Sequence, residues 1–225
     1  MSDEARAQIL GNIRRALKRG ELEQPIREAL DQRLAAPRRG IELGRTRIDH
    51  ASLIELFATM AEKAAANVVR LANDDEIGPA ITSVLKQHNL PASLVVSPEL
   101  KGMDWASQKM LEVRFDRATI DDLVSVTPAH VGVAETGTLM LMSAPDRPTT
   151  LNFLPDTHIV VLKAKDIVAT YEDGWDRWRK DHKDGPPRTA NFVTGPSRTG
   201  DIEQQLLLGA HGPRRLVILL VGDDG

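Results

Sequence analysis

Apolar residues beyond residue 50 repeat at two different spacings. From 50 to 67, Leu53, Phe57 and Met60 recur at the three- and four-residue steps that place side chains on one face of a helix. The same reasoning predicts three more helices, at 74–90, 167–180 and 198–209. The segments between these helices are short apolar runs without a helical period.

The short apolar runs predict the strands of a buried sheet. Runs such as "VVL" and "LVILLV" do not alternate with polar residues, which is typical of strands covered on both faces. Because strands and helices take turns along the chain, the pattern indicates crossover connections and a mainly parallel sheet in an α/β fold. The predicted strands are 67–71, 92–98, 111–115, 123–127, 138–143, 158–163, 189–196 and 214–223.

The first 40 residues carry a separate helical pattern. Ile9, Ile13 and Leu17 are four residues apart, and Ser2 is a suitable cap for the helix that contains them. A second helix is predicted over 22–36. The predicted domains are therefore an N-terminal helical arm, 1–40, and an α/β domain, 41–225.

Charge leaves two interpretations of the arm open. It holds nine Lys and Arg against six Asp and Glu, an excess of three positive charges, whereas the whole chain carries a net charge of −3. The arm either packs on its own domain or docks, as a basic segment, on a partner chain or on a second copy of this chain.

Composition excludes several classes of protein. The 225 residues include no Cys, so the chain forms no disulfide and holds neither Cys-ligated zinc nor an iron–sulfur cluster of its own. Its histidines lack the spacing of a metal-binding motif. The negative charge and the lack of a basic motif argue against nucleic-acid binding. We expect a cytoplasmic protein, because no apolar run approaches the ~18 residues of a membrane span and no signal-peptide pattern is found.

Ligands of open α/β sheets bind beyond the carboxyl ends of the strands, which draws attention to the loop "TGPSRTG". Gly195 lets the backbone approach a ligand, and Ser197, Arg198 and Thr199 bring hydroxyl groups and a guanidinium. Since a helix is predicted next, the loop is either an anion cradle at the helix N-terminus or a turn with a helix cap. Asp201 suits the cap, because a carboxylate in the first turn stabilises a helix by itself.

A second polar loop, "AETGT", joins two predicted strands. Glu135 beside the turn of Thr136, Gly137 and Thr138 could act as a base, a nucleophile or a hydrogen-bond anchor. The alternative is an ordinary turn in which the threonines bond to the backbone and Glu135 faces solvent.

Further polar residues gather near two other strands. Arg147, Asn152, Asp156 and His158 are grouped around the predicted strand at 158–163. His211 precedes the last strand, where a loop is expected at the opposite edge of the sheet from a ligand. The sequence therefore favours a structural role for His211.

Four segments, in order, resemble the LUD-domain family over residues 50–223: "AETGTLML", "RPTTLNFLPDTHIVVL", "TGPSRTGDIE" and "LGAHGPRRLVILLV". The resemblance implies a three-layer α/β/α fold similar to that of ribose-5-phosphate isomerase and the CoA transferases. It makes Glu135 the catalytic candidate. The ligand-binding candidates that it implies are Thr136, Gly137, Thr138, Gly195, Ser197, Arg198, Thr199 and Asp201.

The resemblance also implies a role in the oxidation of L-lactate to pyruvate, beside partner subunits that carry iron–sulfur clusters. The chain would then have no cofactor of its own and would bind a small anion or carboxylate at the sheet edge. Two alternatives stay open. One is a free-standing acyl- or CoA-transferase-like enzyme that uses Glu135 as its nucleophile, and the other is a regulator that binds a metabolite without turnover.

Overall fold

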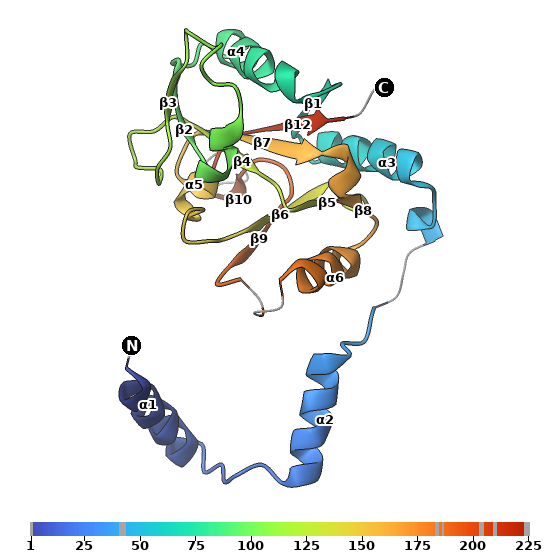
Figure 1. Cartoon of the computed structure of the whole chain (residues 1–225), viewed down its shortest axis with the longest axis vertical. Helices are drawn as coiled ribbons and strands as arrows, with labels where there is room; N and C mark the ends of the chain where they lie inside the picture. The colour runs from blue at the N-terminus through green and yellow to red at the C-terminus, as the bar shows by residue number, and fades with distance from the viewer. Residues whose placement is uncertain are drawn as a thin grey trace. The chain divides into compact units, whose positions relative to one another are not determined.

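The computed structural model describes residues 2–40, 44–182, 185, 187–202, 205–208 and 211–222, with the backbone alone between 199 and 208. The chain divides into two compact units, Met1–Ile41 and Glu42–Gly225. Figure 1 colours both along the chain from blue to red. None of the described helices combines the length and the apolar composition that crossing a bilayer would need.

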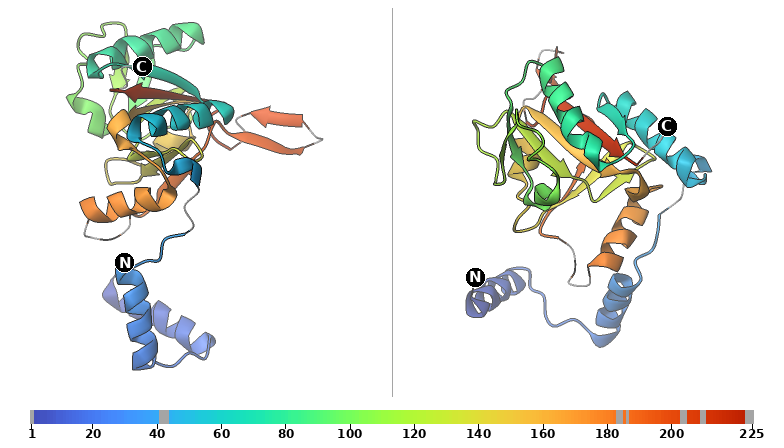
Figure 2. Two further views of the ribbon diagram at one scale, coloured as in Figure 1. Left: turned by 90° about the vertical axis from the view of Figure 1, so that its right-hand side faces the viewer. Right: turned by 45° about the horizontal axis from the view of Figure 1, so that its top comes forward.

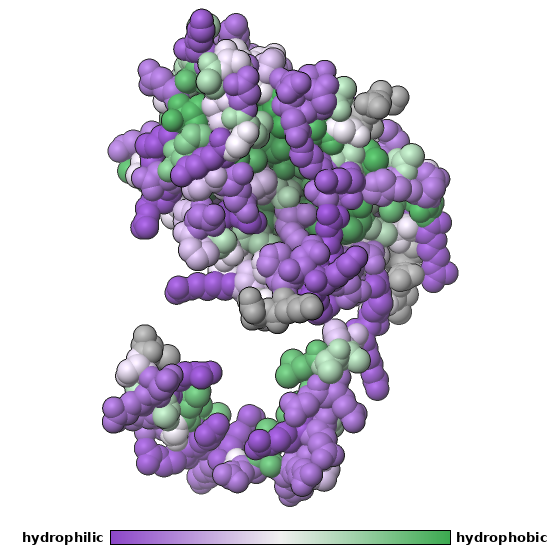
Figure 3. Space-filling model, viewed as in Figure 1, coloured by the Kyte–Doolittle hydropathy of each residue, from purple (hydrophilic) through white to green (hydrophobic). Residues whose placement is uncertain are grey.

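Two amphipathic helices make up the N-terminal unit: α1, Asp3–Ala16, and α2, Gln24–Ala35. Ser2 caps α1 as predicted, and its hydroxyl accepts a hydrogen bond from the Ala5 N–H at 3.3 Å. Neither of these fully described helices buries a residue, and Figure 3 shows apolar side chains among polar ones on their surface. The exposed apolar residues of this unit are Ile9, Leu10, Ile13, Leu17, Leu22, Ile26, Leu30 and Leu34.

A six-stranded parallel sheet lies at the centre of the second unit (Figure 1). Its strands are β1 (Asn67–Leu71), β2 (Ser93–Val96), β3 (Glu112–Arg114), β4 (Val124–Pro128), β7 (Thr157–Lys163) and β12 (Arg215–Val221). They follow the order β1–β12–β7–β4–β2–β3, and every neighbouring pair is parallel. The prediction of an α/β fold with a mainly parallel sheet flanked by helices is confirmed.

Four other strands form a second, mixed sheet that the sequence pattern does not separate from the first. They are β5 (Val131–Val133), β6 (Thr138–Met142), β8 (Ile167–Val168) and β9 (Ala190–Val193). In the order β8–β5–β6–β9, β5 and β8 are parallel, and β6 is antiparallel to both of its neighbours. The "AETGT" loop is the tight connection between β5 and β6.

Helices cover the two sheets in layers (Figure 1, Figure 2). The helices are α3 (His50–Lys63), α4 (Ile77–Gln87), α5 (Thr150–Phe153) and α6 (Tyr171–Asp181), with 3-10 turns at Gly44–Thr46, Asp74–Glu76, Pro98–Gly102 and Ala164–Asp166. Residues of α4 such as Ile81 pack on one face of the parallel sheet. On its other face, Phe57 of α3 shares a core with residues of the second sheet. Trp178 of α6 covers the far side of that second sheet.

The prediction of a helix over 198–209 is wrong. The chain forms instead an antiparallel hairpin of β10 (Arg198–Ile202) and β11 (Gln205–Leu208), which projects from the unit in Figure 2. Gly200 costs a helix about 1 kcal/mol relative to Ala, and the apolar run 206–208 suits a strand as well as a helix. No helix begins at the "TGPSRTG" loop within the described residues, so the predicted anion cradle loses the helix N-terminus on which it depended.

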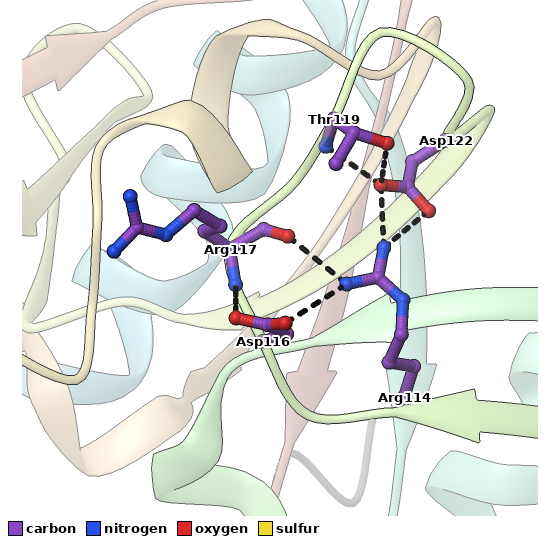
Figure 4. Close-up of polar contacts among 5 residues, drawn as sticks. All are labelled: Arg114, Asp116, Arg117, Thr119 and Asp122. Atoms are coloured by element: carbon purple, nitrogen blue, oxygen red, sulfur yellow. Dashed lines mark hydrogen bonds and ion pairs between the residues drawn. The ribbon is translucent and has the colours of Figure 1, made fainter.

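A charged cluster holds the connection between β3 and β4 (Figure 4). Arg114 Nη2 donates to both carboxylate oxygens of Asp122, at 2.7 and 2.6 Å, and Arg114 Nη1 donates to the Arg117 carbonyl at 3.1 Å. Asp122 also accepts hydrogen bonds from the N–H and the hydroxyl of Thr119. Burial works to raise the pKa of Asp122, but these hydrogen bonds outweigh it and lower that pKa below its ordinary value. The cluster thereby anchors β3, an edge strand of three residues.

Candidate functional site

The threonines of the "AETGT" loop belong to a cluster of hydroxyl groups. Thr138 Oγ1 lies 2.7 Å from Thr136 Oγ1, 2.9 Å from the Tyr171 hydroxyl and 2.6 Å from Thr194 Oγ1. Thr136 Oγ1 lies 2.9 Å from the same Tyr171 hydroxyl. Because Thr194 opens the "TGPSRTG" loop, the cluster joins the two loops that the sequence singled out.

Both loops also close on the end of α3. Gly137 has φ +66°, and a Cβ built there would lie 2.2 Å from the Ala61 nitrogen. Gly195 has φ +70°, and its Cβ would lie 2.0 Å from the Ala64 carbonyl oxygen. A side chain fits at neither position. Packing against α3 is therefore one reason for a glycine at each.

Glu135 is partly buried and lies two residues beyond the end of β5. Its N–H donates to the Ala169 carbonyl at 3.2 Å, and its own carbonyl accepts from Arg45 Nη2 at 3.0 Å. These contacts fix the backbone of Glu135. The residue does not line either of the two pockets described below, and its role as a nucleophile stays a prediction.

Arg198 contacts the end of a helix. Its Nη2 donates to the Ala64 carbonyl oxygen at 3.2 Å, and Ala64 is the residue that caps α3 at its C-terminus. A positive charge at this end of a helix is favoured by the helix dipole. Thr199 and Asp201 belong to β10, but their side chains lie outside the described part of the chain, as does the whole of Glu203.

Gly195, Ser197 and His211 meet at a pocket of about 260 Å³, which we call the amino-edge pocket. The Ser197 N–H donates to the Pro213 carbonyl at 2.8 Å, so the "GPSRT" and "HGP" segments are joined through their backbones. The pocket lies at the amino ends of β7 and β12, beside Leu216. The sequence analysis predicts a ligand at the opposite, carboxyl edge, on the assumption that the strand before the "TGPSRTG" loop belongs to the parallel sheet. That strand is β9, and it belongs to the second sheet.

His158 is a buried polar side chain of the amino-edge pocket. It is fully buried on β7, and its Nε2 lies 2.7 Å from Thr127 Oγ1. Its Nδ1 has no hydrogen-bond partner among the described residues. Burial lowers the pKa of His158 to about 3, so the ring is neutral near pH 7. The free nitrogen can therefore donate or accept one hydrogen bond, according to the tautomer.

A second pocket, of about 300 Å³, lies at the carboxyl ends of β2, β4 and β7, and we call it the carboxyl-edge cleft. Glu99 follows β2, His130 follows β4, and Asp166 follows β7. Arg147 forms an ion pair with Glu99, and Arg177 of α6 forms one with Asp166. This is the edge at which parallel sheets bind their ligands.

Two nitrogen atoms of the carboxyl-edge cleft are buried without a hydrogen-bond partner in the described part of the chain, Arg147 Nε and His130 Nε2. Partial burial lowers the pKa of His130, and the Arg177 charge acts in the same direction. Burial raises the pKa of Glu99, against the opposing effect of Arg147. The cleft thus offers a guanidinium N–H and a largely neutral imidazole to a small ligand.

The sequence analysis predicts more of the amino-edge pocket than of the carboxyl-edge cleft. It noted Arg147 and His158 as polar residues but assigned neither to a site, and it missed Glu99, His130 and Arg177. The available signal was position, since Glu99 and His130 each lie within three residues of the end of a strand. Among the described residues, no group of three or more His, Asp or Glu side chains is arranged to hold a metal ion.

Curated relatives resemble part of the chain. Over 96 residues it is 38% identical to an uncharacterized protein of Neisseria meningitidis serogroup B, which covers 43% of this chain and 41% of the relative. Over 102 residues it is 34% identical to lactate utilization protein C of Bacillus subtilis, which covers 44% of this chain and 42% of the relative. The matching segment is thus about two fifths of each relative's length.

One solved structure resembles the fold over most of the chain. It is the crystal structure of a DUF162 family protein from Deinococcus radiodurans, with a TM-score of 0.60 and 24% sequence identity, covering 78% of this chain and 99% of the other. The family model of the LUD domain matches residues 54–221, nearly all of the second unit. The chain therefore belongs to the LUD domain family.

Proposed function

We propose that this chain is a subunit of a system that oxidises L-lactate to pyruvate, and that it acts with iron–sulfur partner proteins. Relatives named lactate utilization protein C, in Bacillus subtilis and in an Exiguobacterium species, support the pathway. The oxidation releases two electrons and two protons, which need an acceptor. The chain has no Cys to hold a cluster, so an iron–sulfur acceptor has to reside on a partner.

The carboxyl-edge cleft is the place we propose for a small carboxylate. The observation that carries this assignment is the buried Nε of Arg147, a cationic donor without a partner in the described residues. A guanidinium bonds to a carboxylate through charge-assisted hydrogen bonds. His130 lines the same cleft and can accept a hydrogen bond from a hydroxyl group beside that carboxylate. A 2-hydroxy acid has both groups on neighbouring carbon atoms.

The binding site can be tested with Arg147→Gln. The variant should bind L-lactate and pyruvate about 10- to 150-fold more weakly in calorimetry, because a hydrogen bond to a charged group contributes about 1.5–3 kcal/mol. Arg179→Gln is the matched control, since Arg179 also pairs with a carboxylate, that of Asp176, but does not line the cleft. Unchanged affinity in Arg147→Gln, or no affinity of the parent protein for either acid, would refute the assignment.

The cellular role needs its own measurement. Deletion of the gene in its native host should abolish growth on L-lactate, and a tagged copy should co-purify with iron–sulfur proteins. Normal growth of the deletion strain would contradict the proposed function. Lost growth together with unchanged affinity in Arg147→Gln would keep the function and move the carboxylate elsewhere.

A further inference from the structure

We propose that the amino-edge pocket binds a small, planar, uncharged molecule, with Nδ1 of His158 as its hydrogen-bonding partner. This site lies at the opposite end of β7 from the carboxyl-edge cleft. The proposal does not rest on a role in lactate oxidation.

The side chain of His158 supplies the hydrogen-bonding group of the pocket. The side chain is fully buried and is held at Nε2 by Thr127, while Nδ1 lacks a partner within the described residues. Buried polar atoms in folded proteins are nearly always hydrogen-bonded, so a bonding ligand would complete an otherwise unsatisfied group. Asn152, which is 5% exposed, lines the same pocket and adds an amide.

The lining of the amino-edge pocket favours an uncharged ligand. The described residues that line the amino-edge pocket include no Lys, Arg, Asp or Glu. Its walls are formed in part by apolar side chains such as Pro196, Pro213 and Leu216. A carboxylate, a phosphate or an ammonium would lose its hydration there without gaining an opposite charge. An uncharged ligand loses much less hydration free energy on entering the pocket.

An aromatic ring also lies at the pocket. Phe153 of α5 lines it and is 40% exposed, and its Cδ1 would lie 3.9 Å from a Cβ on Gly212. A partly exposed ring at a pocket that holds about 260 Å³ favours contact with another flat ring.

The "GPSRT" and "HGP" segments form one wall of the pocket. The backbone bond from Ser197 to Pro213 joins them, and a Cβ on Gly212 would lie 3.4 Å from the Ser197 Cβ. Gly195 packs on Ala64 and so fixes where this wall stands. These residues therefore shape a cavity around His158 and contribute no charge to it.

Benzamide and benzoate make a matched test, because they share size and shape and differ in charge. Binding is followed by NMR, through the Leu216 methyl groups and the His158 ring nitrogens, at pH 8, where histidines of ordinary pKa are neutral. We expect benzamide to shift these signals and to bind at least about tenfold more tightly than benzoate. Equal or tighter binding of benzoate, or no shift with benzamide, would overturn the proposal.

A surface variant avoids disturbing the core. Phe153→Ala should weaken benzamide binding by up to about tenfold, and Ile120→Ala, at an 84% exposed position outside the pocket, should leave it unchanged. Equal affinity in Phe153→Ala and the parent protein would contradict the site. Lactate affinity is measured separately on the same samples, so failure of this proposal and failure of the proposed function are distinguishable.

Discussion

His158 affects both the stability of the fold and the proposed ligand site. It lies near the start of β7, an interior strand of the parallel sheet, and is fully buried, with one nitrogen bonded to Thr127 and the other without a partner in the described part of the chain. Such a residue is tolerated only in its neutral form, because a buried imidazolium without a counter-charge is strongly disfavoured. Protonation is therefore coupled to unfolding.

We predict that acid destabilises the fold through His158. Its folded-state pKa of about 3 lies below the ordinary value of 6.5, so between these values the unfolded chain binds a proton that the folded chain does not. The free energy of unfolding should fall by about 2 kcal/mol from pH 7 to pH 5 through this residue alone. Urea titrations across this range measure the effect.

The comparison variants for that measurement are His158→Gln and His211→Gln. The first should remove most of this pH dependence, because glutamine does not titrate. The second should retain it, because His211 is exposed. A slope that is the same in the parent protein and in His158→Gln would show that other groups cause the pH dependence.

At the scale of elements, the C-terminal end of α3 organises both loops. Gly137 and Gly195 approach its last turn within distances that exclude a side chain, and Arg198 donates to its terminal carbonyl. The hydroxyl cluster around Thr138 ties the same loops to each other and to Tyr171 of α6. The geometry of the amino-edge pocket therefore depends on a helix that does not line it.

We predict that Gly195→Ala destabilises the protein by about 3 kcal/mol or more, because it adds both a left-handed backbone strain and a clash with Ala64. Gly102→Ala is the matched control. A Cβ at Gly102 meets nothing within 4 Å. The free energy of unfolding of this variant should therefore differ from that of the parent protein by no more than about 1 kcal/mol. Chemical denaturation compares the two, and similar losses would contradict the packing role of Gly195.

Elements could be predicted from the sequence where one physical signal dominated. The strands of the parallel sheet are continuous apolar runs, and β1 was predicted with the bounds that the structure has. The hairpin of β10 and β11 was mistaken for a helix because its short apolar run carries no period of its own. The second sheet was missed because its strands, among them the two-residue β8, are defined by pairing rather than by local pattern.

At the scale of the whole molecule, the two pockets differ in how much of each can be predicted from the sequence. The amino-edge pocket brings together the "GPSRT" and "HGP" segments, both of which the sequence analysis had noted as motifs. The carboxyl-edge cleft is lined from five separate parts of the chain, which contribute Glu99, His130, Arg147, Asp166 and the α6 residues Arg177 and Asp181. No local pattern links such residues, because only the crossover topology places the ends of their strands at one edge.

Strand β7 runs between the two pockets, with His158 near its start and Asp166 three residues beyond its end. At about 3.3 Å per residue, its length separates the pockets by about 20 Å. Perturbations at such distances usually add within about 0.5 kcal/mol. A double-mutant cycle on unfolding free energies with Arg147→Gln and Phe153→Ala should therefore show no coupling. A coupling energy well above that value would mean that one buried strand transmits information between the two ends of the sheet.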